Sequence, residues 1–204
     1  MSAPAIVLAS ASPRRSQLLE QLGLRFEVVP ADVDEAEEAG ETASAHARRL
    51  ALTKARAVAA LRSDALVVGG DTVVTLHDEI LGKPADQGDA LRTLLRLQGH
   101  EHRVETGVAV VAPGGSEAVD VVGADVRFRR FDRAFAEAYV ATGEPLDKAG
   151  AYGIQGYGAA LVESIRGDYF AVMGLPVARL VELFGELGWR YGFDGRLRPA
   201  DGSG

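Results

Sequence analysis

The fold class follows from the stretch AIVLASASPRRSQLLEQLG, at residues 5–23. Residues 5–9 are all apolar and rich in strand formers, which is typical of a strand buried on both faces. Ser12 and Pro13 are a favoured N-cap and a favoured first helical residue, and Gly23 is a favoured helix stop. A buried strand, a tight loop and a helix therefore follow one another directly, and this order indicates an α/β fold.

Strand and helix patterns alternate along the rest of the chain. Short apolar runs predict strands at 26–29, 66–68 and 73–76, the last two separated by Gly69-Gly70-Asp71, and a long hairpin at 102–111 and 118–128. Apolar spacing predicts helices over 43–62, 86–98, 132–142 and 176–187. No repeat or linker interrupts this order, so we expect one continuous domain over residues 1–190 and a flexible tail over 191–204.

Composition and charge exclude several classes of protein. The chain has 204 residues, no Cys, four scattered His and a net charge of −7. The lack of cysteine excludes disulfides, a thiol nucleophile and cysteine-bound metals, and the scattered histidines argue against a histidine metal cage. The acidic balance argues against a nucleic-acid polymer or an anionic membrane as partner. With no membrane-length apolar run and no signal-peptide pattern, the expected location is the cytoplasm.

The start of the first predicted helix is a candidate phosphate site. The first N–H groups of a helix lack partners within the helix, and the positive end of its dipole attracts anions. Ser10 and Ser12 can add hydroxyl donors, and Arg14 and Arg15 can add guanidinium groups. Arginines in a first turn oppose the dipole unless an anion is present. The alternative is that Ser12 only caps the helix and the arginines are solvated, and we favour anion binding.

Two groups of carboxylates are candidate metal ligands. Asp34 and Glu35 lie in a loop that is acidic throughout, and Asp71 follows two glycines between apolar runs. Carboxylate oxygens are the preferred protein ligands of Mg²⁺. The alternatives are a solvated acidic loop for the first pair and a structural turn for Asp71. The local pattern alone favours the solvated loop for Asp34 and Glu35, and it leaves the role of Asp71 open.

The scarcity of lysine draws attention to the lysines that remain. Lys54, Lys83 and Lys148 are the only three in an arginine-rich chain, which suggests that a compact charge matters there, although chance explains any one of them. The glycine-dense block 147–158 contains Gln155, whose amide suits the edge of a base. Together with the phosphate site and the carboxylates, these features indicate a nucleotide-processing enzyme that uses a divalent cation.

At this point the chain resembles the Maf family of nucleoside triphosphate pyrophosphatases. The matching motifs occur in family order and cover residues 5 to about 187: LASASPRR at 8–15, DVDE at 32–35, ALTKA at 51–55, GDTVV at 70–74, LGKP at 81–84, DKAGAYGIQGYGA at 147–159 and GDYFAVMGLP at 167–176. The resemblance implies a mixed sheet with flanking helices, in two lobes around a central cleft, similar to the inosine-triphosphate pyrophosphatases. It also implies hydrolysis of a nucleoside triphosphate to the monophosphate and pyrophosphate with Mg²⁺ or Mn²⁺.

The resemblance also assigns roles to particular residues. Five residues would hold the phosphates: Ser10, Arg14, Arg15, Lys54 and Lys83. The two lysines would also assist catalysis. Glu35 and Asp71 would coordinate the metal, with Asp71 as the proton acceptor. Thr72 and Gln155, together with Arg14, would set the choice of base. The block DKAGAYGIQG at 147–156 is similar to that of the subgroup acting on dTTP and UTP.

Two departures from the family pattern bear on specificity. Gly70 stands where the family more often has Ser or Ala, and Ala171 stands where many members have Asn. The alternatives to a dTTP and UTP pyrophosphatase are a pyrophosphatase for modified or purine nucleotides such as 7-methyl-GTP, and a nucleotide-sensing inhibitor of cell division with little turnover. Family members are commonly homodimers, so a homodimer is expected. Some members are linked to septum formation.

Overall fold

The computed structural model describes residues 4–200 and shows an α/β protein built on a mixed sheet. Its seven strands are β1 (Ile6–Leu8), β2 (Phe26–Val28), β3 (Leu66–Leu76), β4 (Glu79–Ile80), β5 (Glu101–Val111), β6 (Glu117–Phe128) and β7 (Val162–Gly167). The order is β2-β1-β3-β5-β6-β7, with β4 paired to β3. Strand β1 is parallel to β2 and β3, and the remaining pairs are antiparallel.

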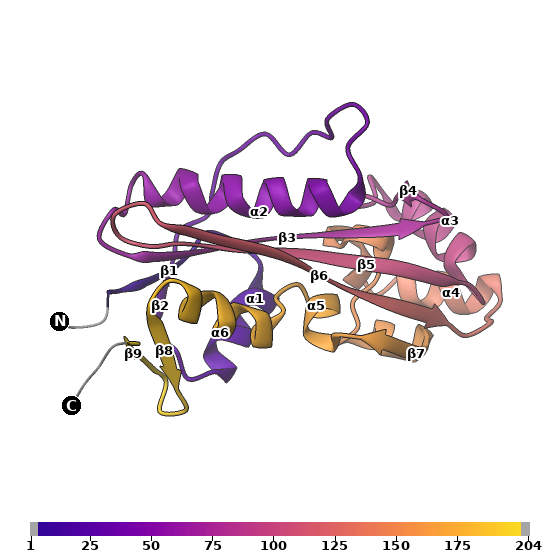
Figure 1. Ribbon diagram of the computed structural model, residues 1–204. Helices are drawn as coiled ribbons and strands as arrows, with labels where there is room; N and C mark the ends of the chain where they lie inside the picture. The colour runs from indigo at the N-terminus through magenta and orange to yellow at the C-terminus, as the bar shows by residue number, and fades with distance from the viewer. Residues whose placement is uncertain (1–3, 201–204) are drawn as a thin grey trace.

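Helices cover both faces of this sheet. They are α1 (Pro13–Gln21), α2 (Ala43–Ala59), α3 (Gln87–Leu97), α4 (Arg133–Val140), α5 (Tyr169–Met173) and α6 (Val177–Glu186), with short 3₁₀ turns η1 (Glu144–Asp147), η2 (Ala149–Ala151) and η3 (Tyr157–Leu161). Helix α2 lies along one face, whereas α1, α5 and α6 lie on the other (Figure 1). Figure 1 also shows β3, β5 and β6 running from an end that holds β1 and β2 to an end that holds α3, α4 and β7. The predicted α/β class, mixed sheet and flanking helices are confirmed.

The core is divided by the sheet into two layers. The larger cluster lies on the side of α1, α3, α4 and α6 and includes the fully buried Phe128 and Phe184. The smaller cluster lies under α2 and is made mostly of Ala and Val side chains. Small side chains allow a helix to approach a sheet closely, so the second layer is thin.

Glycines in the sheet set the distance between α2 and the sheet. The prediction of two strands broken at residues 69–71 is wrong, because β3 continues through them in register with β5. A Cβ on Gly69 would overlap the carbonyl oxygen of Ala51, and a Cβ on Gly107 of β5 would overlap that of Ala47. The glycines therefore serve the close approach of α2 to the sheet and do not end a strand.

The C-terminal part also departs from expectation. The tail predicted from residue 191 is instead a hairpin of β8 (Trp189–Gly192) and β9 (Arg196–Pro199). Its Leu197 is buried, and the Tyr191 hydroxyl donates to the carbonyl of Leu22, 2.6 Å away. Packing of these apolar side chains against the end of α1 orders a stretch whose glycines and charges indicated a tail. The last part of the expected tail, residues 201–204, lies outside the described residues.

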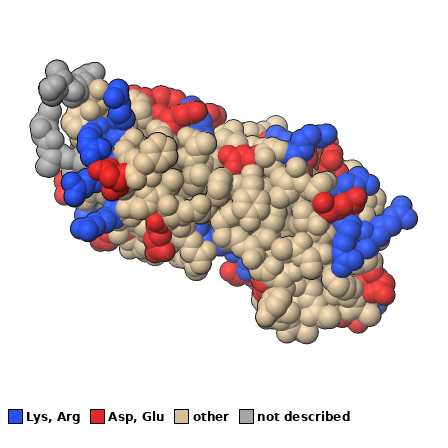
Figure 2. All heavy atoms as spheres, turned by 90° about the horizontal axis from the view of Figure 1, so that it is seen from below, with Lys and Arg blue, Asp and Glu red and all other residues tan. Residues whose placement is uncertain are grey.

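Charged side chains are unevenly spread over the surface. Seen from below, the central part of the molecule carries few of them, and Lys, Arg, Asp and Glu gather toward its ends and edges (Figure 2). Within residues 4–200, no helix combines the length and the apolar character needed to cross a membrane.

Candidate active site

One cleft brings most of the predicted site residues together. It has a volume of about 720 Å³ and is bordered by the β1–α1 loop, the acidic loop before α2, β3, the segment after β4 and the η1–η2 segment. Its lining includes Ser10, Arg14, Arg15, Glu35, Lys54, Asp71, Thr72 and Lys83. Gln155 is exposed beside the lining residue Ile154 and does not itself border the cleft, so its role in base choice stays a prediction.

A lysine joins the two predicted metal-binding carboxylates. Lys54 Nζ lies 2.7 Å from Glu35 Oε1 and 2.7 Å from Asp71 Oδ1. The Lys54 and Asp71 side chains are buried, whereas that of Glu35 is about half exposed. Partial burial acts to raise the pKa of Glu35, but the hydrogen bond and charge of Lys54, with the charge of Lys83, hold this pKa below its usual value. The arrangement keeps two carboxylates and an ammonium together at one side of the cleft.

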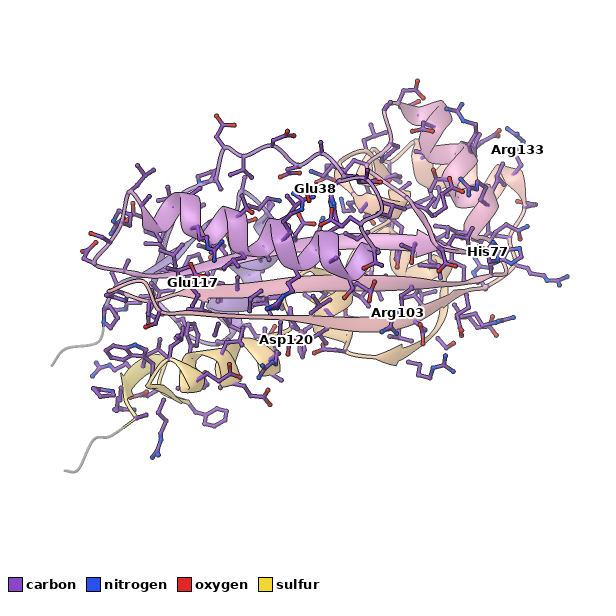
Figure 3. The ribbon with its side chains drawn as sticks, turned by 45° about the horizontal axis from the view of Figure 1, so that its top comes forward. Glu38, His77, Arg103, Glu117, Asp120 and Arg133 are labelled. Carbon is purple, nitrogen blue, oxygen red and sulfur yellow. The ribbon has the colours of Figure 1, made fainter. Side chains whose placement is uncertain are left out.

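The acidic loop that carries Glu35 is fixed to α2 by an arginine that the sequence analysis missed. Arg49 donates to both carboxylate oxygens of Glu41 and to the carbonyl of Ala36, and it pairs with Glu38 at 3.4 Å. Figure 3 shows Glu38 in the loop beside α2. Hydrogen bonds from Arg49 lower the pKa of Glu41 to about 2. The acidic loop is therefore held against the helix and is more than a solvated connection.

Arg15 hydrogen-bonds to other groups of the protein, in addition to the phosphate contact that its sequence position predicts. Its side chain is buried, and it donates from Nε to the Gly174 carbonyl at 2.8 Å, from Nη1 to Ser10 Oγ at 2.9 Å and from Nη2 to Thr72 Oγ1 at 3.2 Å. Burial lowers the pKa of Arg15, and the negative charge of Asp71 opposes this shift. Three of the five N–H donors of the guanidinium thus hold neighbouring groups in place. Direct phosphate binding by Arg15 stays a prediction.

The β1–α1 loop presents hydrogen-bond donors to the cleft. Ser10 Oγ accepts from Arg15 and from the backbone N–H of Ser12, so both of its lone pairs are used and its proton is free to donate. The Ser12 side chain makes no capping hydrogen bond, which leaves the first N–H groups of α1 without a side-chain acceptor. Arg14 is half-buried and lies at the same end of the helix. These groups form a donor set that suits phosphate oxygens.

A partly buried carboxylate organises the glycine-dense block. Glu144 accepts from the Tyr139 hydroxyl at 2.8 Å and from the backbone N–H groups of Tyr157 at 2.8 Å and Gly158 at 3.0 Å. A Cβ on Gly156 would overlap the Glu144 carboxylate, which explains the glycine there. Glu144 has no distinctive signal in the sequence, because its partners lie up to 14 residues away and only the fold brings them together.

A divalent cation in this cleft would need ligands besides the protein's own side chains. Within the described part of the chain, no group of three or more His, Cys, Asp or Glu side chains is placed to hold a metal ion. Glu35 and Asp71 meet at Lys54 Nζ. Mg²⁺ is commonly bound by one or two carboxylates, waters and substrate phosphates, so two converging carboxylates beside a phosphate site fit this ion.

An α/β protein whose cleft joins a donor-rich helix start to a lysine-bridged carboxylate pair is of the class that binds phosphorylated ligands. A comparison with family models makes this specific, because the model described as Maf-like protein matches residues 5–187. The chain belongs to the Maf family, as the motifs indicated.

Individual relatives agree with this assignment. The chain is 53% identical over 184 residues to a dTTP/UTP pyrophosphatase of Moorella thermoacetica, covering 90% of this chain and 95% of the relative. It is 46% identical over 182 residues to a dTTP/UTP pyrophosphatase of Aquifex aeolicus, covering 89% and 95%.

Among solved structures, it is similar to a nucleoside-triphosphatase / dITP/XTP pyrophosphatase from Mycobacterium abscessus, with a TM-score of 0.42, 20% identity and coverage of 90% and 97%.

Proposed function

We propose that this protein hydrolyses dTTP and UTP to the nucleoside monophosphate and pyrophosphate. Relatives that share about half of its residues over nine-tenths of its length carry the name dTTP/UTP pyrophosphatase. The single observation that carries the proposal is the contact of Lys54 with both Glu35 and Asp71, beside the donors at the start of α1. Hydrolysis needs a proton acceptor next to the bound phosphates, and Asp71, held in place by Lys54, is the proposed acceptor.

The proposed mechanism assigns each group a role. The triphosphate is held by the Ser10 hydroxyl, the first N–H groups of α1 and Arg14, and by Lys83, which also lines the cleft. Asp71 accepts a proton from the attacking water as a bond from the water oxygen to the α-phosphorus forms and the bond to pyrophosphate breaks. Lys54 neutralises the negative charge that accumulates on the phosphate oxygens in the transition state.

A divalent cation is part of this proposal. Glu35 and Asp71 would hold Mg²⁺ or Mn²⁺, which would neutralise phosphate charge when bound. Removal of the metal with EDTA should abolish turnover, and addition of Mg²⁺ or Mn²⁺ in excess should restore it. Undiminished turnover after exhaustive chelation would contradict the cation requirement while leaving the substrate assignment open to its own test.

The experiment that tests the function is a product assay on a panel of nucleotides. dTTP, UTP, CTP, GTP, ITP and 7-methyl-GTP are each incubated with the protein and Mg²⁺ or Mn²⁺, and the products are separated. We expect monophosphate and pyrophosphate, formed fastest from dTTP and UTP. Release of orthophosphate and a diphosphate would overturn the reaction type. Binding of nucleotide without turnover would favour the nucleotide-sensing alternative.

Assembly and location remain part of the proposal. We infer a homodimer, supported by the family resemblance and by the largely uncharged central face in Figure 2, which offers a surface for a second copy. Light scattering after size-exclusion chromatography tests this, and a monomer mass at working concentration would contradict it. We place the protein in the cytoplasm, since dTTP and UTP are used there, and cell fractionation tests this location.

A further inference from the structure

A second cavity lies between the C-terminal hairpin and the end of the sheet that holds β1 and β2. Its volume is about 800 Å³. Its walls are the first residues of β1 and β2, the turn after α1, and the hairpin from Asp194 to Pro199. Figure 1 shows β8 and β9 beside β2, at the opposite end of the sheet from α3 and α4. No lining residue is shared with the candidate active site, so this cavity is separate from the cleft.

The hairpin that forms one wall is fixed against the end of α1. Gly23 and Gly195 have positive φ angles of 70° and 74°, and a Cβ on Gly195 would overlap the carbonyl oxygen of Gly23. The lack of a side chain at Gly195 therefore lets the two turns touch. The hydrogen bond from the Tyr191 hydroxyl to the Leu22 carbonyl joins the same two segments. The hairpin lies beyond residue 187, where the match to the family model ends, so this wall is outside the matched region.

Both carboxylates that line the cavity are already neutralised. Glu27 pairs with Arg62, which is not part of the lining. Asp194 pairs with Arg198, and the hydrogen bond from Arg198 lowers the pKa of Asp194. The charge of each carboxylate is therefore balanced before the remaining arginines of the lining are considered.

Two arginines of the lining have no counter-charge. Arg25 and Arg196 are exposed, and among the described residues neither guanidinium makes a hydrogen bond or an ion pair. Most exposed arginines of the described surface pair with a carboxylate instead. Arg25 and Arg196 closely follow the two glycines at which the turns touch, so both side chains extend from one junction.

We propose that this cavity is a second anion-binding site, which takes a phosphate group through Arg25 and Arg196. The forked N–H donors of a guanidinium fit phosphate oxygens, and two guanidinium groups offset the charge of a phosphate dianion. A volume of about 800 Å³ lies within the usual range of small-molecule sites, so the cavity admits a nucleotide as well as free phosphate. The proposal does not depend on the hydrolysis proposed for the cleft, because the two sites share no residue.

The test locates binding by two-dimensional NMR of the ¹⁵N-labelled protein. Inorganic phosphate or UMP is added at constant ionic strength, the Gly195 and Leu197 amides report on the cavity, and the Ser12 amide reports on the cleft. We expect saturable shifts at the cavity amides. Equal or tighter binding of inorganic phosphate identifies the free ion as the ligand, and tighter binding of UMP identifies a nucleotide. Shifts that are absent, or that stay linear in concentration for both probes, would overturn the proposal.

Three arginine variants test the assigned residues. Arg25→Gln and Arg196→Gln should each weaken binding at the cavity amides by at least about tenfold, the equivalent of one hydrogen bond to a charged group. Arg190→Gln is the matched control, because Arg190 is an exposed arginine of β8 in the same hairpin but outside the cavity lining. Equal weakening by Arg190→Gln and Arg196→Gln would overturn the proposal, since it would show diffuse attraction to the hairpin and no specific site.

Loss of the fold and failure of the proposed function both give different results. All three arginines are exposed, so the variants should unfold at the same temperature as the unaltered protein. If Arg25→Gln fails to fold, Arg196→Gln and its control carry the test. Turnover of UTP should be unchanged in Arg196→Gln. Absence of turnover in the unaltered protein would overturn the function proposed for the cleft, and the NMR titration of the cavity would still decide the second site.

Discussion

The ammonium of Lys54 lies 2.7 Å from Oδ1 of Asp71, across the interface between α2 and β3. Both side chains are largely withdrawn from solvent, at 9% and 12% exposure. Burying a charge is costly unless it is paired, so each side chain stabilises the placement of the other. The pair can form because Gly69 lets the segment of α2 around Ala51 lie directly on the sheet. The backbone packing and the chemistry of the cleft are therefore linked.

Asp71→Asn should separate catalysis from binding. The amide oxygen can still accept from Lys54, so the fold should be retained, but the group no longer accepts a proton from water. We expect turnover of UTP to fall by at least about 100-fold with UTP still bound, as measured by product formation and calorimetry. Asp78→Asn is the control, because Asp78 is exposed in the β3–β4 turn at φ 65°, where Asn is well tolerated. Near-native turnover in Asp71→Asn would remove Asp71 from the mechanism.

Gly69→Ala should disturb the interface that places Lys54. The new methyl group would overlap the Ala51 carbonyl and meet Ala55 Cβ at 2.9 Å, so α2 must move away from the sheet. We expect a loss of about 1–3 kcal/mol in the free energy of unfolding, measured by urea denaturation, together with reduced kcat.

The matched control for this substitution is Gly185→Ala. Gly185 lies within α6, with open space where its Cβ would be. Alanine there should stabilise the protein by up to about 1 kcal/mol, because alanine favours the helix. Equal effects of the two substitutions would mean that the close contact of α2 with β3 does not limit stability.

The fold class could be predicted because local sequence patterns determine it. The apolar run at 5–9 and the Ser12-Pro13 helix start lie within one short segment, and the predicted helices agree with α2, α3, α4 and α6 to within a few residues. Strand order could not be predicted, since it depends on pairings between distant segments. Gly69 predicts a strand break from the sequence although β3 is continuous, because glycine has the same sequence signal in a turn and under a closely packed helix.

The candidate site was predictable where a residue's own chemistry marks it. Lys54, Asp71 and the start of α1 stood out by residue type and position, and they border one cleft. Glu144 did not stand out, because a glutamate after a helix has no distinctive local pattern. Its importance comes from partners up to 14 residues away.

Glu144→Gln should loosen the glycine-dense block. The carboxylate accepts three hydrogen bonds, and a side-chain amide must turn an NH₂ group toward one of these donors. We expect hydrogen exchange at the amides of Tyr157 and Gly158 to accelerate by at least about tenfold, the equivalent of one hydrogen bond. Glu163→Gln is the control, because Glu163 is exposed on β7 and pairs only with Arg127 at 3.5 Å among described residues. Unchanged exchange at both amides in Glu144→Gln would show that the block is held by its other contacts.

Acid should destabilise the fold through His102. This side chain is 3% exposed, and its Nε2 lies 2.9 Å from the Tyr152 hydroxyl, with ring contacts to Phe128. Burial lowers the pKa of His102 to about 4, whereas histidine in an unfolded chain titrates near about 6.5. As the pH falls from about 6.5 to about 4, the unfolded chain binds a proton that the folded chain does not, so the free energy of unfolding decreases by at most about 3 kcal/mol.

Well above pH 6.5, from about pH 7.5 upward, the imidazole is neutral in both states, and His102 adds no pH dependence there. Urea denaturation at several pH values checks this, with His102→Gln keeping a polar partner for Tyr152 and removing the titration. Between pH 6.5 and 4, the slope of stability against pH should be shallower in His102→Gln by up to about 1.4 kcal/mol per pH unit. His100→Gln, at an exposed position before β5, should keep the slope of the unaltered protein. Identical slopes in all three proteins would mean that protonation of His102 is not linked to unfolding, and the acid sensitivity would have to come from carboxylates such as the Arg49-bound Glu41.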